Sequence, residues 1–194
     1  MKPVLATVAI LAAVLMASSA FAESEPYTWT ISGDSTNPFA NTGSFLPGLQ
    51  TLYVWLACCN LPDPLMDGMS AAEFGLFSTN PANVILAMTP MNGFLNAGSP
   101  TEPLLAVGGC PCGPVAAASM LVLSNAPGQI CFRASSATGT KGTVDCEPNP
   151  SLYAMAWIGF SDDGAAPCTK GVICKEDPTS VEDSSFGKVK ALYR

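Results

Sequence analysis

The side chains of this chain that could do chemistry are chiefly cysteines and carboxylates, because the sequence contains no histidine. Without histidine, the chain lacks the commonest general base, the usual partner of a serine or cysteine nucleophile, and the commonest ligand of transition metals. Most familiar hydrolase and metalloenzyme mechanisms are therefore excluded. The acidic balance, 15 Asp and Glu against 8 Lys and Arg, also argues against nucleic-acid binding, which requires a basic face.

The eight cysteines are an even set, and in an exported chain such a set is first interpreted as a disulfide framework. They are Cys58, Cys59, Cys110, Cys112, Cys131, Cys146, Cys168 and Cys174. A hairpin centred on the Thr138-Gly139 dipeptide would place Cys131 opposite Cys146. Cys168 and Cys174 enclose a short loop, and we expect them to pair with each other.

The other four cysteines form two close pairs, Cys58-Cys59 and Cys110-Pro111-Cys112. We expect these pairs to meet across the fold as disulfides, with the cross-pairing left open. Metal binding by their thiolates is the functional alternative, because thiolates are ligands of structural zinc. The absence of histidine and an oxidising compartment favour disulfides.

The carboxylates offer two further kinds of site. Asp162 and Asp163 precede a glycine in a loop and would contribute oxygens to a Ca²⁺ site, with a solvated turn as the structural alternative. Asp145 and Glu147 lie one residue apart on an expected strand and would share a face, as the paired acids of a polysaccharide-cleaving enzyme must. Apart from the possible calcium ion, no cofactor is expected.

The three tryptophans are the residues that a carbohydrate-binding face would use, because sugar rings stack on indole rings. Trp55 and Trp157 lie within apolar strand patterns, which favours packing in the core. Trp29 lies between two threonines near the expected start of the mature chain. We therefore expect Trp29 to be partly exposed and take it as the candidate binding residue.

The N-terminal segment has the three parts of a secretory signal peptide. Lys2 supplies a positive charge, Val4 to Met16 is an uncharged apolar run, and Ala20-Phe21-Ala22 is a small-x-small cleavage site. The apolar run is too short to span about 30 Å of hydrocarbon as a helix. Residues 1–22 are thus predicted to be removed, which leaves a chain without stable membrane insertion in the periplasm or outside the cell.

The rest of the chain up to residue 175 consists of short apolar stretches, each closed by Gly, Pro, Asn or Asp. This pattern predicts strands at 27–31, 52–57, 71–77, 84–88, 104–107, 115–123, 129–133, 141–146 and 152–160. Within them, Ala116 to Met120 would equally suit the start of a helix. We therefore predict an all-β, disulfide-rich domain over 23–175, a single antiparallel β-sandwich of jelly-roll or cohesin-like type.

Residues 176–194 differ in character from this domain. A polar connector is followed by Phe186, Val189 and Tyr193, whose spacing predicts a short amphipathic helix at the C-terminus. Two roles stay open for this tail: a strap that docks its apolar stripe on the sandwich, or a sorting signal that other proteins recognise.

Two stretches carry a resemblance to known proteins. The apolar strands Ala71 to Phe77 and Gly113 to Leu123 resemble those of the cohesin-like and carbohydrate-binding β-sandwich modules. The ending Ser185 to Arg194 resembles the tails of uncharacterised exported proteins of environmental bacteria. The first resemblance implies a β-sandwich and protein–protein docking, and no binding residue of those families carries over.

These observations predict a secreted, non-catalytic interaction or structural module that binds protein or glycan at the cell surface or outside the cell. The alternatives are an enzyme that acts on polysaccharide through acidic residues, and a secreted inhibitor. Two carboxylates facing each other across a cleft would favour the enzyme.

Overall fold

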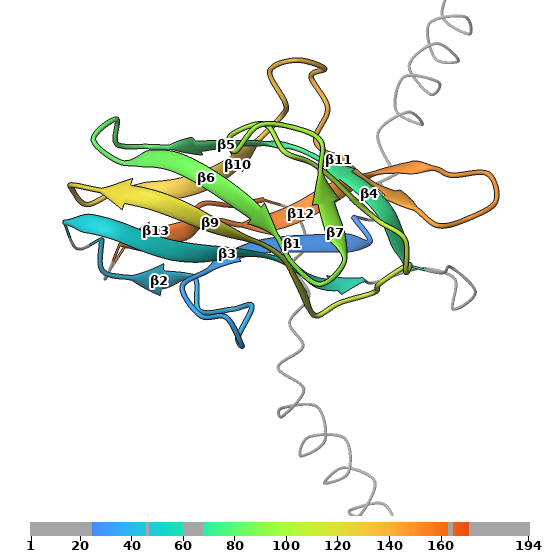
Figure 1. Cartoon of the computed structure of the whole chain (residues 1–194), viewed down its shortest axis with the longest axis horizontal. Helices are drawn as coiled ribbons and strands as arrows, with labels where there is room; N and C mark the ends of the chain where they lie inside the picture. The colour runs from blue at the N-terminus through green and yellow to red at the C-terminus, as the bar shows by residue number, and fades with distance from the viewer. Residues whose placement is uncertain (1–24, 46, 60–67, 163–164, 171–194) are drawn as a thin grey trace, which may run out of the picture.

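The structure is a computed structural model that describes residues 25–45, 47–59, 68–162 and 165–170. Within these ranges the chain contains only strands and the turns between them (Figure 1). The strands are β1 (Tyr27–Ser32), β2 (Thr42–Gly43), β3 (Gly48–Cys59), β4 (Met69–Glu73), β5 (Gly75–Ser78), β6 (Val84–Pro90), β7 (Phe94–Asn96), β8 (Leu104–Val107), β9 (Val115–Ser124), β10 (Gln129–Arg133), β11 (Gly142–Asp145), β12 (Leu152–Ile158), β13 (Phe160–Asp162) and β14 (Thr169–Lys170).

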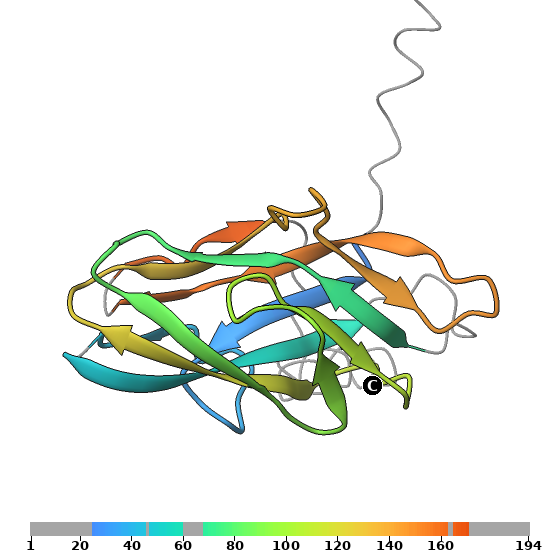
Figure 2. The same cartoon turned by 45° about the horizontal axis from the view of Figure 1, so that its top comes forward.

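The strands form two sheets that enclose one core, as Figures 1 and 2 show. The larger sheet has the order β6-β9-β3-β1-β12-β11-β4-β8-β7, with β14 beside β12, and the smaller has the order β2-β13-β10-β5. The predicted all-β sandwich is therefore confirmed. The predicted C-terminal helix, the signal peptide and the connector lie outside the described residues.

Two pairings depart from the predicted antiparallel arrangement. β1 pairs with β12 in parallel, and β13 pairs with β2 in parallel, whereas the other pairings are antiparallel. Strands far apart in the sequence meet in both cases, and no hairpin constrains their relative direction. The sandwich is thus mixed rather than purely antiparallel.

Two predicted strands are each divided between the sheets. The stretch 71–77 becomes the end of β4 and most of β5, with Phe74 between them, and 152–160 becomes β12 and the start of β13, with Gly159 between them. At this second break the Gly159 N–H donates to the carbonyl oxygen of Cys168 at 2.8 Å instead of to a sheet neighbour. Both segments therefore pass from one sheet to the other and close the corners of the sandwich.

The ambiguous segment Ala116 to Met120 is part of β9. Ala118, Met120 and Val122 alternate toward the core, and β9 lies between β3 and β6. A strand with partners on both edges has its backbone groups paired in full, which outweighs the helix propensity of three alanines.

A carboxylate joins the connection between β7 and β8 to that following β10. Glu102 forms an ion pair with Arg133 and accepts hydrogen bonds at 2.9 Å from both the N–H and the hydroxyl of Ser136. Desolvation is the largest single effect on the pKa of Glu102 and raises it, but the Ser136 hydrogen bonds and the Arg133 charge together bring this pKa below its ordinary value of 4.5.

A lowered pKa in the folded state predicts a small loss of stability in acid. The stabilisation by Glu102 is fully present above pH 4.5 and is lost as the pH falls through the lower pKa of the folded state. Because the pair is partly solvated, we expect Glu102→Gln to cost about 1 kcal/mol or less at pH 7. Urea denaturation of the wild-type protein and of Glu102→Gln at pH 7 and pH 3 checks this. If the difference between their free energies of unfolding grew toward pH 3, the assignment would be contradicted.

Candidate functional site

The candidate binding residue Trp29 lies in the core. Its side chain is fully buried, its indole Nε1–H donates to Thr143 Oγ1 at 2.9 Å, and its ring packs on Phe74 at a centroid distance of 5.4 Å. The neighbours Thr28 and Thr30 are fully buried as well, because β1 is covered on both faces. The prediction of a partly exposed Trp29 that binds a ligand is therefore wrong.

The other tryptophans are packed in the interior as expected, although not to the same extent. Trp55 is buried, and the half-buried Trp157 packs on Phe132 at a centroid distance of 5.9 Å. Lys141 Nζ lies over the Trp157 ring, 4.9 Å from its centre. The ammonium group therefore covers part of this ring. Neither indole presents an open face for stacking on a sugar.

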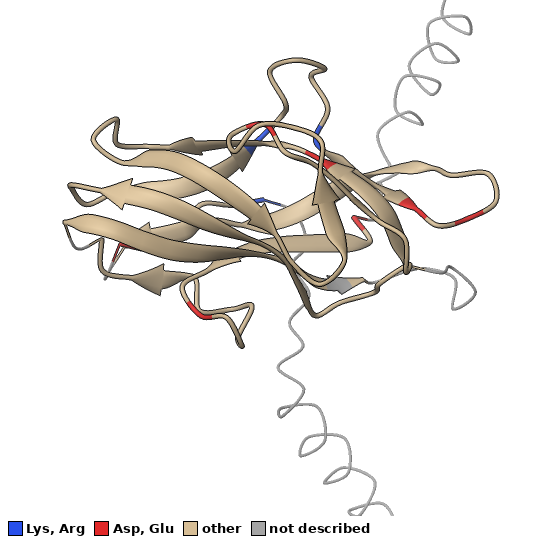
Figure 3. Ribbon diagram, viewed as in Figure 1, with Lys and Arg blue, Asp and Glu red and all other residues tan. Residues whose placement is uncertain are grey.

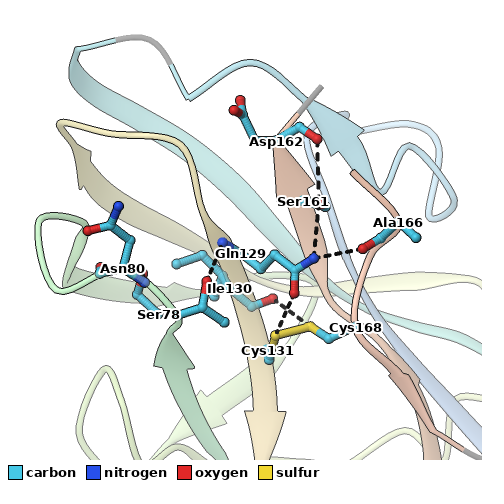
Figure 4. The surroundings of a disulfide bond; sticks show 10 residues. Ser78, Asn80, Gln129, Ile130, Cys131, Ser161, Asp162, Ala166 and Cys168 are labelled. Atoms are coloured by element: carbon cyan, nitrogen blue, oxygen red, sulfur yellow. Dashed lines mark hydrogen bonds between the residues drawn. A yellow bond between two sulfur atoms is a disulfide. The ribbon is translucent and has the colours of Figure 1, made fainter. Parts of the chain in front are cut away.

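Asp162 has a structural contact within the described residues. Its Oδ1 accepts the Phe45 N–H at 3.0 Å, and Figure 4 shows its carboxylate pointing away from the neighbouring disulfide. Asp163 lies outside the described residues, so a calcium site at Asp162 and Asp163 stays a prediction. Among the described residues, no group of three or more cysteine or acidic side chains is arranged to hold a metal ion.

Asp145 belongs to a turn rather than to a pair of catalytic acids. The residue is buried, and its Oδ1 accepts the backbone N–H groups of Glu147 at 3.2 Å and of Ser151 at 3.0 Å. These bonds close the connection between β11 and β12. The Asp145 carboxylate is turned inward by the loop that carries Glu147. The predicted shared face of Asp145 and Glu147 is therefore not formed.

The described residues form two disulfides, and both differ from the predicted pairing. Cys131 pairs with Cys168, with Cα atoms 6.0 Å apart, and Cys110 pairs with Cys146, with Cα atoms 5.9 Å apart. The expected bonds Cys131–Cys146 and Cys168–Cys174 are therefore wrong. Gln129 lies beside the first disulfide and donates to the Ala166 carbonyl oxygen at 2.7 Å, which ties β10 to the segment before Cys168 (Figure 4).

The predicted hairpin around Thr138 and Gly139 fails for a topological reason. β10 pairs with β5 and β13, whereas β11 pairs with β4 and β12. The connection at 134–141 therefore passes between sheets, and Cys131 does not face Cys146. Cys174 and the Cys58 side chain lie outside the described part of the structure.

An uncharged surface lies on the outer side of β6, β9 and β3. Val84, Leu123 and Leu49 form one row across the three strands, because Val84 and Leu49 both pair with Leu123. The second row is Ala87, Leu121 and Thr51, and the third row is Thr89, Ser119 and Tyr53. Each row runs in the order β6, β9 and β3. We call these three rows, together with Leu86, the outer face.

The outer face exposes three aliphatic side chains beside the exposed threonines Thr51 and Thr89. Leu49 is 64% exposed, Leu86 46% and Val84 45%. The three strands carry no Asp, Glu, Lys or Arg, and Figure 3 shows them free of charged residues along their whole length. Leu104, an exposed apolar residue on another strand, instead pairs with the charged Glu73. Contiguous apolar surface of this kind marks a site of interaction.

The inner sides of the same strands already supply the core. Leu52, Met120 and Val122 are buried there, on the opposite side from Leu49 and Leu123. Side chains alternate between the faces of a strand, so folding does not require leucines on the solvent side. The sequence signal was present as apolar residues at both alternate positions of 115–123, which we had assigned to strand formation alone.

The edge of this sheet is protected, although its face is open. β6 is the edge strand, and it contains a bulge between Ile85 and Ala87 and ends at Pro90. Bulges and prolines on edge strands hinder pairing with a further strand. A partner would therefore bind across the outer face rather than extend the sheet.

The comparisons with known proteins find solved structures of low similarity to this chain. No family model matches the chain, and no curated protein matches it. The structures found include the seventh ScaB type I cohesin of Pseudobacteroides cellulosolvens, with a TM-score of 0.48 and 10% identity over 76% of this chain and 98% of that one. The sixth cohesin of Acetivibrio cellulolyticus scaffoldin B, solved in complex with a Cel5 dockerin mutant, has a TM-score of 0.44 and 9% identity. The match covers 70% of this chain and 96% of that one.

A third similar structure is the Coh-OlpC–Doc435 type I cohesin–dockerin complex from Clostridium thermocellum, with a TM-score of 0.45 and 10% identity over 74% and 96% of the two chains. Similarity at this level assigns neither a family nor a partner nor site residues to this chain.

Proposed function

We propose that this chain is a non-catalytic interaction module that binds a protein partner on its outer face. The observation that carries the proposal is the row of Val84, Leu123 and Leu49 on three adjacent strands that contain no charged residue, with Val84 and Leu49 exposed and Leu123 half-buried. Burying such a face on binding removes apolar area from water without stripping any charge of its hydration.

The charge distribution defines the chemistry of the partner. The whole chain has a formal net charge of -7, yet the outer face carries none of it. A strongly charged partner would lose hydration against this face and gain no ion pair there. The occupant is therefore a protein whose contact surface is apolar and uncharged.

A protein suits this face better than a glycan. Sugar-binding surfaces stack rings on exposed aromatic side chains, but Trp29 and Trp55 are buried and the aromatic residue of the outer face, Tyr53, is half-buried. The exposed apolar side chains there, Leu49, Leu86 and Val84, are aliphatic. Aliphatic groups favour packing against the apolar side chains of another protein.

The compartment and the limits of the module are part of the same proposal. The two disulfides suit an oxidising compartment. We place the signal peptide at 1–22, the domain at 23–175, and a connector with its tail at 176–194, with export to the periplasm or beyond. Among the described residues no helix is long and apolar enough to cross a membrane.

Photocrosslinking in the native cells tests the proposal. A photoreactive residue replaces Leu49 in one full-length protein and Leu152 in another, because Leu152 is equally exposed, at 61% against 64%, but belongs to β12. We expect one protein to crosslink at position 49 and not at 152. Once purified, this protein should bind the chain in calorimetry, and Leu49→Asp should weaken that binding strongly.

Two outcomes would overturn the proposal. Equal crosslinking at positions 49 and 152 would show that the outer face has no preference for a partner. The second outcome is that a soluble polysaccharide in a gel slows the migration of the chain and that Leu49→Asp removes this effect. The outer face would then bind a glycan instead.

A further inference from the structure

Two unpaired cysteines lie at the end of the strand pair that builds the outer face. Cys59 is half-buried and Cys112 is exposed, and neither belongs to the two disulfides. β3 and β9 are antiparallel, with Leu56 opposite Val115. Cys59 and Cys112 each lie three residues beyond this pair, Cys59 at the end of β3 and Cys112 before the start of β9. Their side chains are in hydrogen-bonding contact, so the two thiols are within reach of each other.

Backbone contacts hold the segment 110–112 in this position. The Met69 N–H donates to the Pro111 carbonyl oxygen at 3.1 Å, and the Cys146 N–H donates to the Gly68 carbonyl oxygen at 3.2 Å. The carbonyl oxygens of Cys110 and Pro111 lie directly against Gly68, where a side chain would collide with them, and Gly68 has a φ of +77°. The chain around Cys112 is therefore fixed against the sheet rather than free in solvent.

Tyr27 connects this segment to Cys59. It pairs with Cys59 across β1 and β3, and its hydroxyl donates to the Gly68 carbonyl oxygen at 2.9 Å. The same Gly68 carbonyl thus receives bonds from the strand beside Cys59 and from the disulfide-bonded Cys146. Both thiols belong to one rigid corner of the sandwich.

The two thiols differ in their access to solvent. Burial is the main cause that raises the pKa of Cys59, and the neighbouring Cys112 raises it further through a hydrogen bond and through its charge. The thiolate is the nucleophile in disulfide exchange. Cys112, which is exposed, is thus the thiol that an external oxidant meets first.

We propose that Cys59 and Cys112 form a third disulfide, closed by exchange with a small-molecule or protein disulfide. The Cys112 thiolate attacks one sulfur of the oxidant, which forms a mixed disulfide and releases one thiolate. The Cys59 sulfur, after giving its proton to solvent, attacks the Cys112 sulfur and releases the second thiolate. The oxidant gains two electrons, the two cysteines lose two electrons and two protons, and one S–S bond joins β3 to the segment before β9.

This bond would be a modification site beyond the proposed binding function. It joins β3 to the segment before β9, at the end of β3 that is far from Leu49, and it encloses the chain between Cys59 and Cys112. A cross-link that closes a long loop restricts the unfolded chain, so we expect the bond to raise the melting temperature by several degrees.

Peptide mapping of the full chain tests the proposal. The purified protein is reduced, reoxidised with glutathione disulfide, alkylated under denaturing conditions without reductant, and digested. We expect a linked peptide containing Cys59 and Cys112 in addition to the peptides of the other two disulfides. Alkylation of both cysteines, or a link from either of them to Cys58 or Cys174, would overturn the inference.

Single variants separate the roles of the two thiols without requiring the third bond for folding. With Cys59→Ser, the exposed Cys112 should form a stable mixed disulfide with glutathione. With Cys112→Ser, Cys59 should react with a thiol reagent at pH 8 at least tenfold more slowly than Cys112 does in the first variant. A slower reaction of Cys112 than of Cys59 would contradict the proposed order of attack.

Discussion

Trp29→Ala is expected to destabilise the protein by about 3–5 kcal/mol, the cost of removing a large aromatic side chain from a packed core. Trp29 is fully buried between the sheets and contacts Phe74, which in turn packs on Phe132 at a centroid distance of 5.0 Å. The substitution also leaves the Thr143 hydroxyl without its indole donor. Urea denaturation followed by fluorescence and far-UV circular dichroism measures the free energy of unfolding.

Trp29→Phe provides the matched control for this experiment. It retains an aromatic ring against Phe74 but removes the hydrogen bond to Thr143, so we expect a cost of about 1–3 kcal/mol, below that of the alanine variant. If Trp29→Ala changed the free energy of unfolding by less than about 1 kcal/mol, the range of ordinary surface substitutions, the core position of Trp29 would be wrong.

Leu49→Asp is expected to weaken binding of the crosslinked partner about 30-fold or more. A central apolar anchor of an interface contributes about 2 kcal/mol or more, and each 1.4 kcal/mol is about tenfold in affinity. The introduced carboxylate must also lose hydration against an uncharged surface. Isothermal titration calorimetry of the two purified proteins measures this change.

Leu152→Asp is the control, because Leu152 is as exposed as Leu49 but lies at the end of the sandwich where β11 and β12 meet. Both substitutions are on the surface, so each should change the free energy of unfolding by about 0.5 kcal/mol or less. An equal loss of affinity in both variants would indicate a general effect of added charge and would remove the support for the outer face.

The strands of this protein were predictable because they are short and separated by turn-forming residues. The bounds of β8 and β10 agree with the predicted stretches, and those of β1 and β9 differ by one residue at their C-terminal ends. Local patterns of alternation and turn residues determine where a strand begins and ends. The all-β class followed from these local signals alone.

The cysteine pairing was not predictable, because it depends on which sheet each strand enters. Cys131 belongs to β10 and Cys146 directly follows β11, two strands that are near in sequence but lie in different sheets. Cys131 instead meets Cys168 across the corner that Gly159 makes between β12 and β13. A pattern of spacing along the chain contains no information about such a crossing between sheets.

The exposure of Trp29 was mispredicted for a related reason. Polar residues at alternate positions of β1 indicated a solvent-facing side, but these residues are fully buried, and the Thr30 hydroxyl donates to the Pro38 carbonyl oxygen at 2.6 Å. The loop after β1 covers that side and satisfies the polar group. Conversely, Leu49 in an apolar strand is exposed because no described element covers the outer face.

Methyl NMR of the full chain, with and without the purified partner, tests the outer face most directly. The methyl signals of Leu49, Val84, Leu121 and Leu123 are compared with those of Leu95 and Leu152, which are exposed on other strands. We predict that the first group shifts or broadens on binding while the second stays unchanged. Shifts confined to Leu95 and Leu152, with the outer face unaffected, would contradict the proposed binding surface.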